Sequence, residues 1–361
     1  MKTLEQRRAD YEKVSKKIKE LGDEVVAEML KNATQIHSGI GGTAVKLEIE
    51  GVPIFAKQIA LTDLEMANPE STKNLFNLPT YYQYGVGSAG FGAWRELAAH
   101  KITTDWVLNN ECPNFPVMYG SKILPKEKAP PMNHKEEELF DGQIKYWGNS
   151  AEIRNRNAEI RNSTNSLVVL MESIPQTLAS YIHPQASNGN TKSPDMEMVQ
   201  RDLKSTCAFM ESKSMIHFDA HGGNILTDGE RLYFADFGLA TSLDFDLSKA
   251  EKEFFEKNRG YDRSLATACL CWHPCAESGE PLPILPEVAK VSNRYQSVSQ
   301  RYSLFTGSLR DDLTKTTAYP MEEMQKLHQE VDSPEKEKAK KSFVERVSQE
   351  KPNEKDNNGR I

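Results

Sequence analysis

Near its start the chain carries apolar side chains at helical spacing among many charged ones: Leu4, Tyr11, Val14, Ile18, Leu21, Val25, Val26, Met29 and Leu30. Apolar residues spaced in this way form one stripe along a helix, and the charges between them face solvent. The pattern therefore predicts a single amphipathic helix over residues 4–31. We expect its apolar stripe to pack against the rest of the protein.

After this helix the pattern changes to that of β-strands. Residues 45–50 alternate apolar and polar side chains and end at Gly51, and the mostly apolar residues 52–57 follow at once, which predicts a hairpin. A short apolar run at 167–171 predicts a further strand. Residues 225–234 predict two strands joined by a glycine turn.

Helices and irregular segments separate these strands. Apolar residues at helical spacing predict helices over 94–108 and 199–210. Residues 62–92 are rich in Asn, Ser, Pro, Tyr and Gly and show no sustained period, so they predict a long irregular excursion, a kind of segment that often forms a lid or binding loop. Residues 125–166 form a second insertion, which is polar and charged. Together these elements predict an α+β protein.

The composition narrows the classes of protein to which the chain can belong. It has 361 residues, 38% of them hydrophobic, which is enough to build a core. The net charge of −7 gives no overall positive field, so nucleic acid is not an expected partner. No apolar run is long enough to span a membrane, and the charged start differs from a secretory signal, so we expect a cytoplasmic protein without membrane contact. Five cysteines are too few for a disulfide framework.

The most informative residues lie between positions 215 and 238. His217, Asp219 and Asn224 stand in the order His-x-Asp-x-x-x-x-Asn, and Asp-Phe-Gly follows at 236–238, one predicted hairpin later. Carboxylate and amide oxygens are the hard ligands that Mg²⁺ prefers. Aspartates can also merely cap turns, but that role would not explain why all these residue types occur at these spacings on either side of a hairpin. For His217 we expect a supporting role, as a buried hydrogen-bonding side chain.

This stretch resembles the catalytic loop and the Asp-Phe-Gly motif of the protein-kinase-like superfamily, and the resemblance covers roughly residues 36–275. It implies a bilobal fold, with an antiparallel sheet and a helix in the N-lobe and a mainly helical C-lobe. It also implies that Asp219 accepts or orients the proton of an acceptor hydroxyl, and that Asn224 and Asp236 hold Mg²⁺ against the phosphates of ATP. The expected domain order is an N-terminal helix at 1–35, the N-lobe at 36–171 with insertions at 62–92 and 125–166, the C-lobe at 172–318 and a charged tail at 319–361.

A glycine cluster precedes the first predicted hairpin. Backbone N–H groups of such a loop can approach phosphates, and here they would come from Gly39, Gly41, Gly42 and Thr43. The cluster departs from the kinase pattern G-x-G-x-x-G, because Ala44 stands at the third glycine position. Lys57 follows Gly39 by 18 residues, in a Phe-Ala-Lys context similar to the kinase Ala-x-Lys, which implies contact with the α and β phosphates.

Two further parts of the nucleotide site are assigned from the same resemblance. Lys57 needs an acidic partner, and we assign Glu96 because it lies on the only well-formed helix before the next strand. Glu65, within the poorly patterned excursion, remains the competitor. The strand that ends near residue 171 looks like the hinge between lobes, and its Met171, Glu172 and Ile174 would contact adenine.

The motifs leave the acceptor open. Phe218 replaces the usual arginine of His-Arg-Asp, and no Ala-Pro-Glu follows residues 236–238, which puts the usual protein-substrate platform in doubt. The loop from His217 through His221 to Asn224 is similar to that of aminoglycoside and choline kinases. We expect an atypical protein kinase, because the excursion at 62–92 and the tail favour a macromolecular partner. A small-molecule kinase is the alternative.

Two interpretations from other classes are also weighed. A pseudokinase that only binds nucleotide would lack a catalytic part, whereas Lys57, Asp219, Asn224 and Asp236 are all present. A zinc module could use the cysteines and histidine between positions 269 and 275, but their crowding does not suit a tetrahedral site, so buried structural cysteines are expected. The sequence does not indicate the oligomeric state.

Overall fold

The computed structural model describes residues 2–39, 42–84, 87–182, 194–263 and 265–266. The predicted tail at 319–361 and the cysteine cluster at 269–275 lie outside the described residues. None of the helices in the described ranges has the length and apolar character that a membrane crossing requires. The described part is a mixed α+β structure with a five-stranded antiparallel sheet and several helices.

The N-terminal segment forms two helices instead of the single helix predicted over 4–31. Helix α1 spans Leu4–Glu20 and α2 spans Asp23–Lys31. The break occurs because Leu21 adopts an extended backbone and Gly22 stands at the N-cap of α2. The apolar stripe continues across the break, so hydrophobic spacing alone did not reveal it.

The main sheet has the strand order β1-β2-β3-β5-β4, with each neighbouring pair antiparallel. Its strands are β1 (Thr34–Gly39), β2 (Gly42–Ile49), β3 (Val52–Leu61), β4 (Met118–Pro125) and β5 (Asn165–Glu172). The predicted hairpin and the predicted strand at 167–171 are both present. Strand β4 was not predicted, because a register shift between Met118 and Gly120 interrupts the alternation of its side chains.

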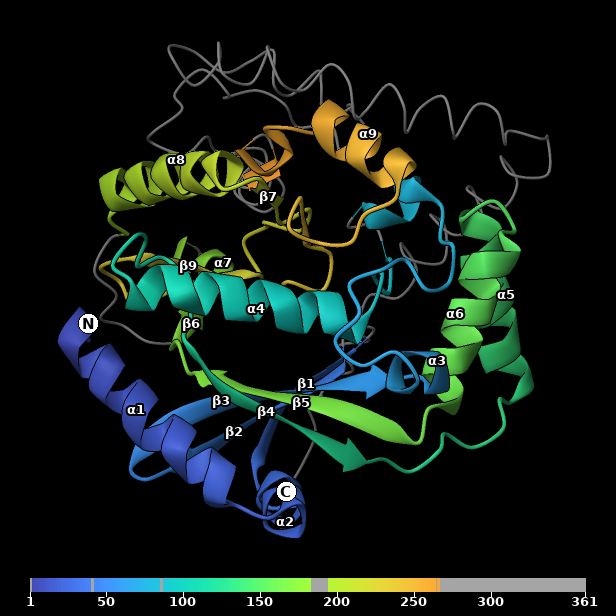
Figure 1. Cartoon of the computed structure of the whole chain (residues 1–361), viewed down its shortest axis with the longest axis horizontal. Coiled ribbons are helices and arrows are strands. Elements are labelled where there is room, and N and C mark those ends of the chain that lie inside the picture. The colour runs from blue at the N-terminus through green and yellow to red at the C-terminus, as the bar shows by residue number, and fades with distance from the viewer. Residues whose placement is uncertain (1, 40–41, 85–86, 183–193, 264, 267–361) are drawn as a thin grey trace, which may run out of the picture. The chain divides into compact units, whose positions relative to one another are not determined.

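Helix α4 (Ala93–Leu108) packs on one face of this sheet, across which it runs in Figure 1. Trp94 and Leu97 belong to a buried cluster with Leu167, Val169 and Met171 of β5. Glu65 accepts a hydrogen bond from the backbone N–H of Ala93, 2.8 Å away, which satisfies a donor at the helix N-terminus. The helix predicted over 94–108 is therefore present and is held at its start.

The two insertions are folded and pack together. The 62–92 segment contains α3 (Asp63–Met66) and a 3₁₀ turn (Thr80–Gln83), while 125–166 contains α5 (His134–Tyr146) and α6 (Ala151–Asn162). Helices α5 and α6 lie side by side (Figure 1). The fully buried ring of Tyr82 meets the ring of Trp147 edge-on, with centroids 4.8 Å apart. Tyr82 of the first insertion thus forms part of the hydrophobic core of the second.

The rest of the described chain carries the predicted catalytic loop. It contains β6 (Gln176–Thr177), α7 (Leu178–Ile182), α8 (Met196–Ser212), β7 (Met215–Ile216), β8 (Ile225–Thr227), β9 (Leu232–Phe234), β10 (Thr241–Ser242) and α9 (Lys249–Lys257). The helix predicted over 199–210 lies within α8. The two strands predicted over 225–234 are β8 and β9, which pair antiparallel. These short strands place residues 217–224 and 236–238 on neighbouring loops.

Candidate active site

Lys57 joins two carboxylates that come from distant parts of the chain. Its Nζ lies 2.7 Å from Glu96 Oε1 on α4 and 2.7 Å from Asp236 Oδ1 after β9. The pairing with Lys57 therefore falls to Glu96. Glu65 lies elsewhere, where it caps α4 and has Arg156 Nη1 3.2 Å from its Oε2.

Burial and the neighbouring charges together set the protonation of these three groups. Burial would lower the pKa of Lys57, but the adjacent charges of Asp236 and Glu96 raise it. Burial raises the pKa of Glu96 to about 7, against the opposing effect of Lys57. Burial also acts to raise the pKa of Asp236, but Lys57 outweighs it and brings that pKa to about 2. The Asp236 side chain is 42% exposed, so this ionised carboxylate remains available to a ligand.

Asp219 and Asn224 form the second part of the site, on the loop between β7 and β8. Asn224 Nδ2 donates to Asp219 Oδ2 at 2.8 Å and to the Asp219 backbone carbonyl at 3.1 Å. His221 Nε2 lies 3.8 Å from Asp219 Oδ1. Burial raises the pKa of Asp219 to about 6, with His221 acting in the opposite direction. A carboxylate with such a pKa can take up a proton near neutral pH, as a general base does.

One residue of this loop and one residue after β9 have a strained backbone, and buried groups support both segments. Phe218 and Asp236 both have a φ of 62°, a value that side chains other than glycine seldom adopt. His217 Nε2 lies 2.8 Å from the carbonyl of Ala235, so the ring supports the loop as expected. Burial lowers the pKa of His217 to about 4, which keeps the ring neutral near neutral pH.

Asp262 is a supporting residue that the sequence analysis missed. Its carboxylate accepts hydrogen bonds from the backbone N–H groups of His217, at 2.7 Å, and Phe218, at 2.9 Å. Burial raises the pKa of Asp262 to about 7, against the effect of these two donors. No local pattern marks this aspartate, because its partners lie 44 and 45 residues away in the sequence.

The side-chain oxygens of Asn224 and Asp236 suit a Mg²⁺ ion that also binds phosphate oxygens. Asn224 uses its amide nitrogen toward Asp219, and no hydrogen bond from the described residues reaches its Oδ1. Asp236 binds Lys57 and the N–H of Gly238 through Oδ1, which leaves Oδ2 for a ligand. No group of three or more His, Cys, Asp or Glu side chains in the described ranges could hold a metal by itself. Mg²⁺ commonly takes one or two protein oxygens together with phosphate oxygens and water, so the pair fits.

Two residues of the predicted glycine cluster lie at the site. Gly42 and Thr43, at the start of β2, line the same cavity as Asp219 and Asp236. Gly39 ends β1 opposite Gly42, and Gly41 lies outside the described residues. Gly42 also has a structural role, since a Cβ there would lie 2.1 Å from the carbonyl oxygen of Gln58. Only glycine lets β2 approach β3 this closely.

The residues assigned to the hinge do not line this cavity. Met171 packs in the cluster under α4, and Ile174 is half-buried in the connection from β5 to β6. The backbone N–H of Glu172 donates to the carbonyl of Val117 at 2.8 Å, so this donor is already used. The expected contact between Glu172 and adenine would have to use its carbonyl instead.

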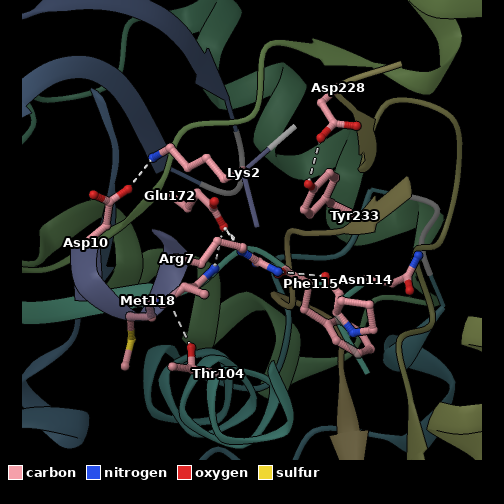
Figure 2. Close-up of polar contacts among 12 residues, drawn as sticks. Lys2, Arg7, Asp10, Thr104, Asn114, Phe115, Met118, Glu172, Asp228 and Tyr233 are labelled. Carbon is pink, nitrogen blue, oxygen red and sulfur yellow. Dashed lines mark hydrogen bonds and ion pairs between the residues drawn. The ribbon is translucent and has the colours of Figure 1, made fainter. Parts of the chain in front are cut away.

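The Glu172 side chain is held by Arg7 of α1. Its Oε2 accepts from Arg7 Nε at 3.0 Å and from Nη2 at 2.7 Å, and both side chains are almost completely buried. Arg7 also donates to the carbonyls of Pro113 and Phe115. Figure 2 shows the guanidinium between Glu172 and Phe115. No sequence pattern marks this contact, since Arg7 is one charge among many in an amphipathic helix.

A cavity of about 940 Å³ connects the predicted catalytic residues with the insertions. Glu96, Asp219, Asn224 and Asp236 line it together, as do residues of β3, of segment 87–93 and of α5 and α6. The structure thus brings the predicted general base, metal ligands and lysine partner to one site. Residues of α5 and α6 were missed, because the polar composition of 125–166 gave no indication of a cavity wall.

No protein-family model matches the chain, and no curated protein matches it significantly. The chemistry of the site must therefore be inferred from the residues and geometry described above.

Proposed function

We propose that this chain is a phosphotransferase of the protein-kinase-like superfamily, which uses ATP and Mg²⁺ to phosphorylate a hydroxyl acceptor. The observation that carries the proposal is the position of Lys57, 2.7 Å from both Glu96 and Asp236, beside the Asp219–Asn224 pair. A buried lysine shared by a helix carboxylate and the Asp-Phe-Gly carboxylate is how kinases place the nucleotide phosphates.

The arrangement of elements supports a bilobal interpretation. An antiparallel sheet with one helix on its face precedes the catalytic loop, and the helices α7, α8 and α9 surround or follow that loop. Strand β5 ends at Glu172, and the connection 173–175 leads to the second part, which agrees with a hinge. These features favour the N-lobe at 36–171 and the C-lobe beginning at 172 that the resemblance implies.

In this proposal each residue has a distinct task. Lys57 binds the α and β phosphates, and Glu96 keeps its ammonium in place. Asn224 and Asp236 would hold Mg²⁺, which supplies positive charge to the phosphate oxygens. Asp219 takes the proton of the acceptor hydroxyl as that oxygen bonds to the γ-phosphorus and the bond from the γ-phosphorus to the departing ADP oxygen breaks.

The proposal is tested with the full chain and two substitutions. Titration calorimetry with the analogue AMP-PNP and Mg²⁺ should show one nucleotide site, whose affinity Lys57→Met lowers by about 10- to 100-fold, the equivalent of a lost charge-assisted contact. Asp219→Asn should keep that affinity and lower phosphoryl transfer from ATP by about 10²- to 10⁴-fold. It removes the carboxylate that acts as base but leaves the backbone carbonyl of residue 219, to which the Asn224 side chain donates.

The same experiment separates an enzyme from a nucleotide-binding scaffold. If Asp219→Asn and the unaltered chain release ADP and phosphorylate acceptors at the same rate, the catalytic assignment is wrong. Lys101→Met serves as a matched control, because Lys101 lies on α4 and its ion pair with Glu70 is exposed to solvent. Loss of AMP-PNP binding in this control would mean that removing a positive charge lowers affinity by disturbing the fold and not by removing a contact with the nucleotide.

The expectation of a protein acceptor stays a prediction, but one of its reasons is removed. It rested on the 62–92 segment as a surface for a macromolecule. In the structure Tyr82 and Tyr84 of this segment are buried, and Gln143 of α5 donates to the carbonyl of Gly87 at 3.1 Å. The segment forms a wall of the cavity, and this bears on which acceptor the cavity can admit.

A further inference from the structure

The cavity extends from the catalytic carboxylates in the direction away from the predicted hinge. It is bordered by Ser166 at the start of β5 and by Gln58, Ile59 and Ala60, which follow Lys57 on β3. Glu172 lies at the other end of β5, about 20 Å from Ser166 at roughly 3.3 Å per residue. If adenine lies at the hinge and the phosphates lie at Lys57, this part of the cavity is beyond the γ-phosphate. That is where an acceptor would bind, and we call it the acceptor side.

Two insertions border this acceptor-side space. Segment 87–93 forms one wall and the helices α5 and α6 another, and the hydrogen bond from Gln143 to Gly87 joins them. We call this space the outer chamber. Its apolar lining residues are Met132, Leu139, Phe140 and Ile160, and its polar ones include Lys126, Asn157 and the ion pair of Glu136 with Arg161. The whole cavity, at about 940 Å³, lies in the size range of small-molecule sites, roughly 300–1,000 Å³.

The outer chamber also contains polar groups whose bonding is incomplete. Asn157 is 8% exposed, and its Nδ2 donates to no acceptor in the described structure, although its Oδ1 accepts from Tyr82. A buried donor without an acceptor is costly, and a ligand acceptor would satisfy it. Lys126 contacts Ser163 Oγ at 3.2 Å and forms no ion pair with any described carboxylate. Lys126 is exposed, and partial burial lowers its pKa.

We propose that the outer chamber binds a small amphipathic alcohol that carries an acidic group, and that this molecule, not a protein, is the acceptor. Its apolar part would contact Phe140 and Ile160, its acidic group would lie toward Lys126 and Asn157, and its hydroxyl would point to Asp219. This inference rests on the proposed phosphotransferase function for the role of the ligand, but not for its binding.

Binding is tested first, with anilinonaphthalene sulfonate as an amphipathic anionic probe and the full chain. Saturable binding is expected, and Ile160→Trp should weaken it by more than about tenfold, because a bulky side chain on α6 fills the chamber. Lys126→Met should weaken it by about fivefold. Asn155→Trp is the matched control, since Asn155 lies on the exposed face of the same helix and does not line the cavity.

If the probe binds equally to the unaltered chain and to Ile160→Trp, or does not saturate, the chamber is not a ligand site and the inference is wrong. Transfer is then measured with ATP labelled at the γ-phosphate. The acceptors come from an extract of the source cells, which ultrafiltration separates into a small-molecule fraction and a protein fraction. Label should appear in small molecules and be lost with Ile160→Trp but not with Asn155→Trp. Label in proteins, unaffected by Ile160→Trp, would overturn the choice of acceptor. AMP-PNP binding without any transfer would instead contradict the proposed function and leave the chamber as a binding site.

Discussion

At the scale of single residues, the lysine and the carboxylates at its side are surrounded by neutral buried groups. His100 lies one turn after Glu96 on α4, with its Nε2 3.9 Å from Glu96 Oε1 and its ring edge-on to Phe237. Neither ring nitrogen of His100 has a hydrogen-bond partner in the described structure. Burial lowers the pKa of His100 to about 3, and Lys57 acts in the same direction. The ring therefore packs as a neutral group in the folded protein.

This burial makes His100 a source of acid sensitivity. Unfolded histidine takes up a proton below its ordinary pKa of 6.5, whereas folded His100 does so only near 3. The stability it contributes is therefore complete above pH 6.5 and is lost as pH falls toward 3, by up to about 1.4 kcal/mol per pH unit. His100→Leu should remove this loss. Urea unfolding across this pH range measures it, and parallel stability curves for the two proteins would contradict the prediction.

At the scale of elements, α1 is bound to the sheet by both apolar and charged contacts. Ile18 of α1 lies close to Gly120 of β4, and Arg7 reaches the end of β5 and the segment before β4. The Arg7 guanidinium also lies over the ring of Tyr233 in β9, 5.4 Å from its centroid. Helix α1 thus connects the sheet with the strand that leads to Asp236 (Figure 2).

Replacing Arg7 should destabilise the protein strongly. Arg7→Met would leave Glu172 buried without its partner, and breaking one side of a buried ion pair costs about 3–5 kcal/mol. The neighbouring Arg8 is the control, because it is exposed and donates only to the carbonyl of Leu108; Arg8→Met should cost about 1 kcal/mol or less. Chemical denaturation measures both. Equal losses from the two substitutions would show that the buried pair has no special weight.

At the scale of the whole described chain, the first insertion touches the Asp-Phe-Gly segment. A Cβ at Gly90 would lie 2.2 Å from the carbonyl oxygen of Gly238, and Gly90 has a φ of +70°. The two residues are distant in sequence, so this contact exists only because the insertion folds back over the site. Gln83 of the same insertion also donates to the carbonyl of Leu239. The insertion therefore fixes the backbone that follows Asp236.

Gly90→Ala should disturb catalysis through this contact. The Gly238 carbonyl must move, which costs about 1–3 kcal/mol and displaces Asp236, so AMP-PNP affinity and phosphoryl transfer should both fall by about tenfold. Gly51→Ala is the control, because Gly51 has a φ of +75° but open space at its Cβ. It should cost about 1 kcal/mol of stability and leave nucleotide affinity unchanged. A comparable loss of affinity in both variants would attribute the effect to backbone strain alone.

Much of the candidate site could be predicted because its residues are neighbours in sequence. Asp219 and Asn224 lie on one short loop, and Asp236 follows after a single hairpin, so residue type and spacing indicated them. The strands β2, β3 and β5 and the helix α4 followed from side-chain periodicity in the same way. Strand β4 and the break at Gly22 were missed, because a bulge and a single extended residue leave little trace in that periodicity.

The sequence by itself determined the identity of the chemical groups and the local elements that carry them, since both depend on residues a few positions apart. The tertiary structure alone decided that Glu96 and not Glu65 meets Lys57, that Asp262 supports the loop at His217, and that Arg7 neutralises Glu172. It also turned two polar insertions into walls of a chamber. These outcomes depend on contacts between residues distant along the chain, where burial and the pairing of charges, not local pattern, select the partner.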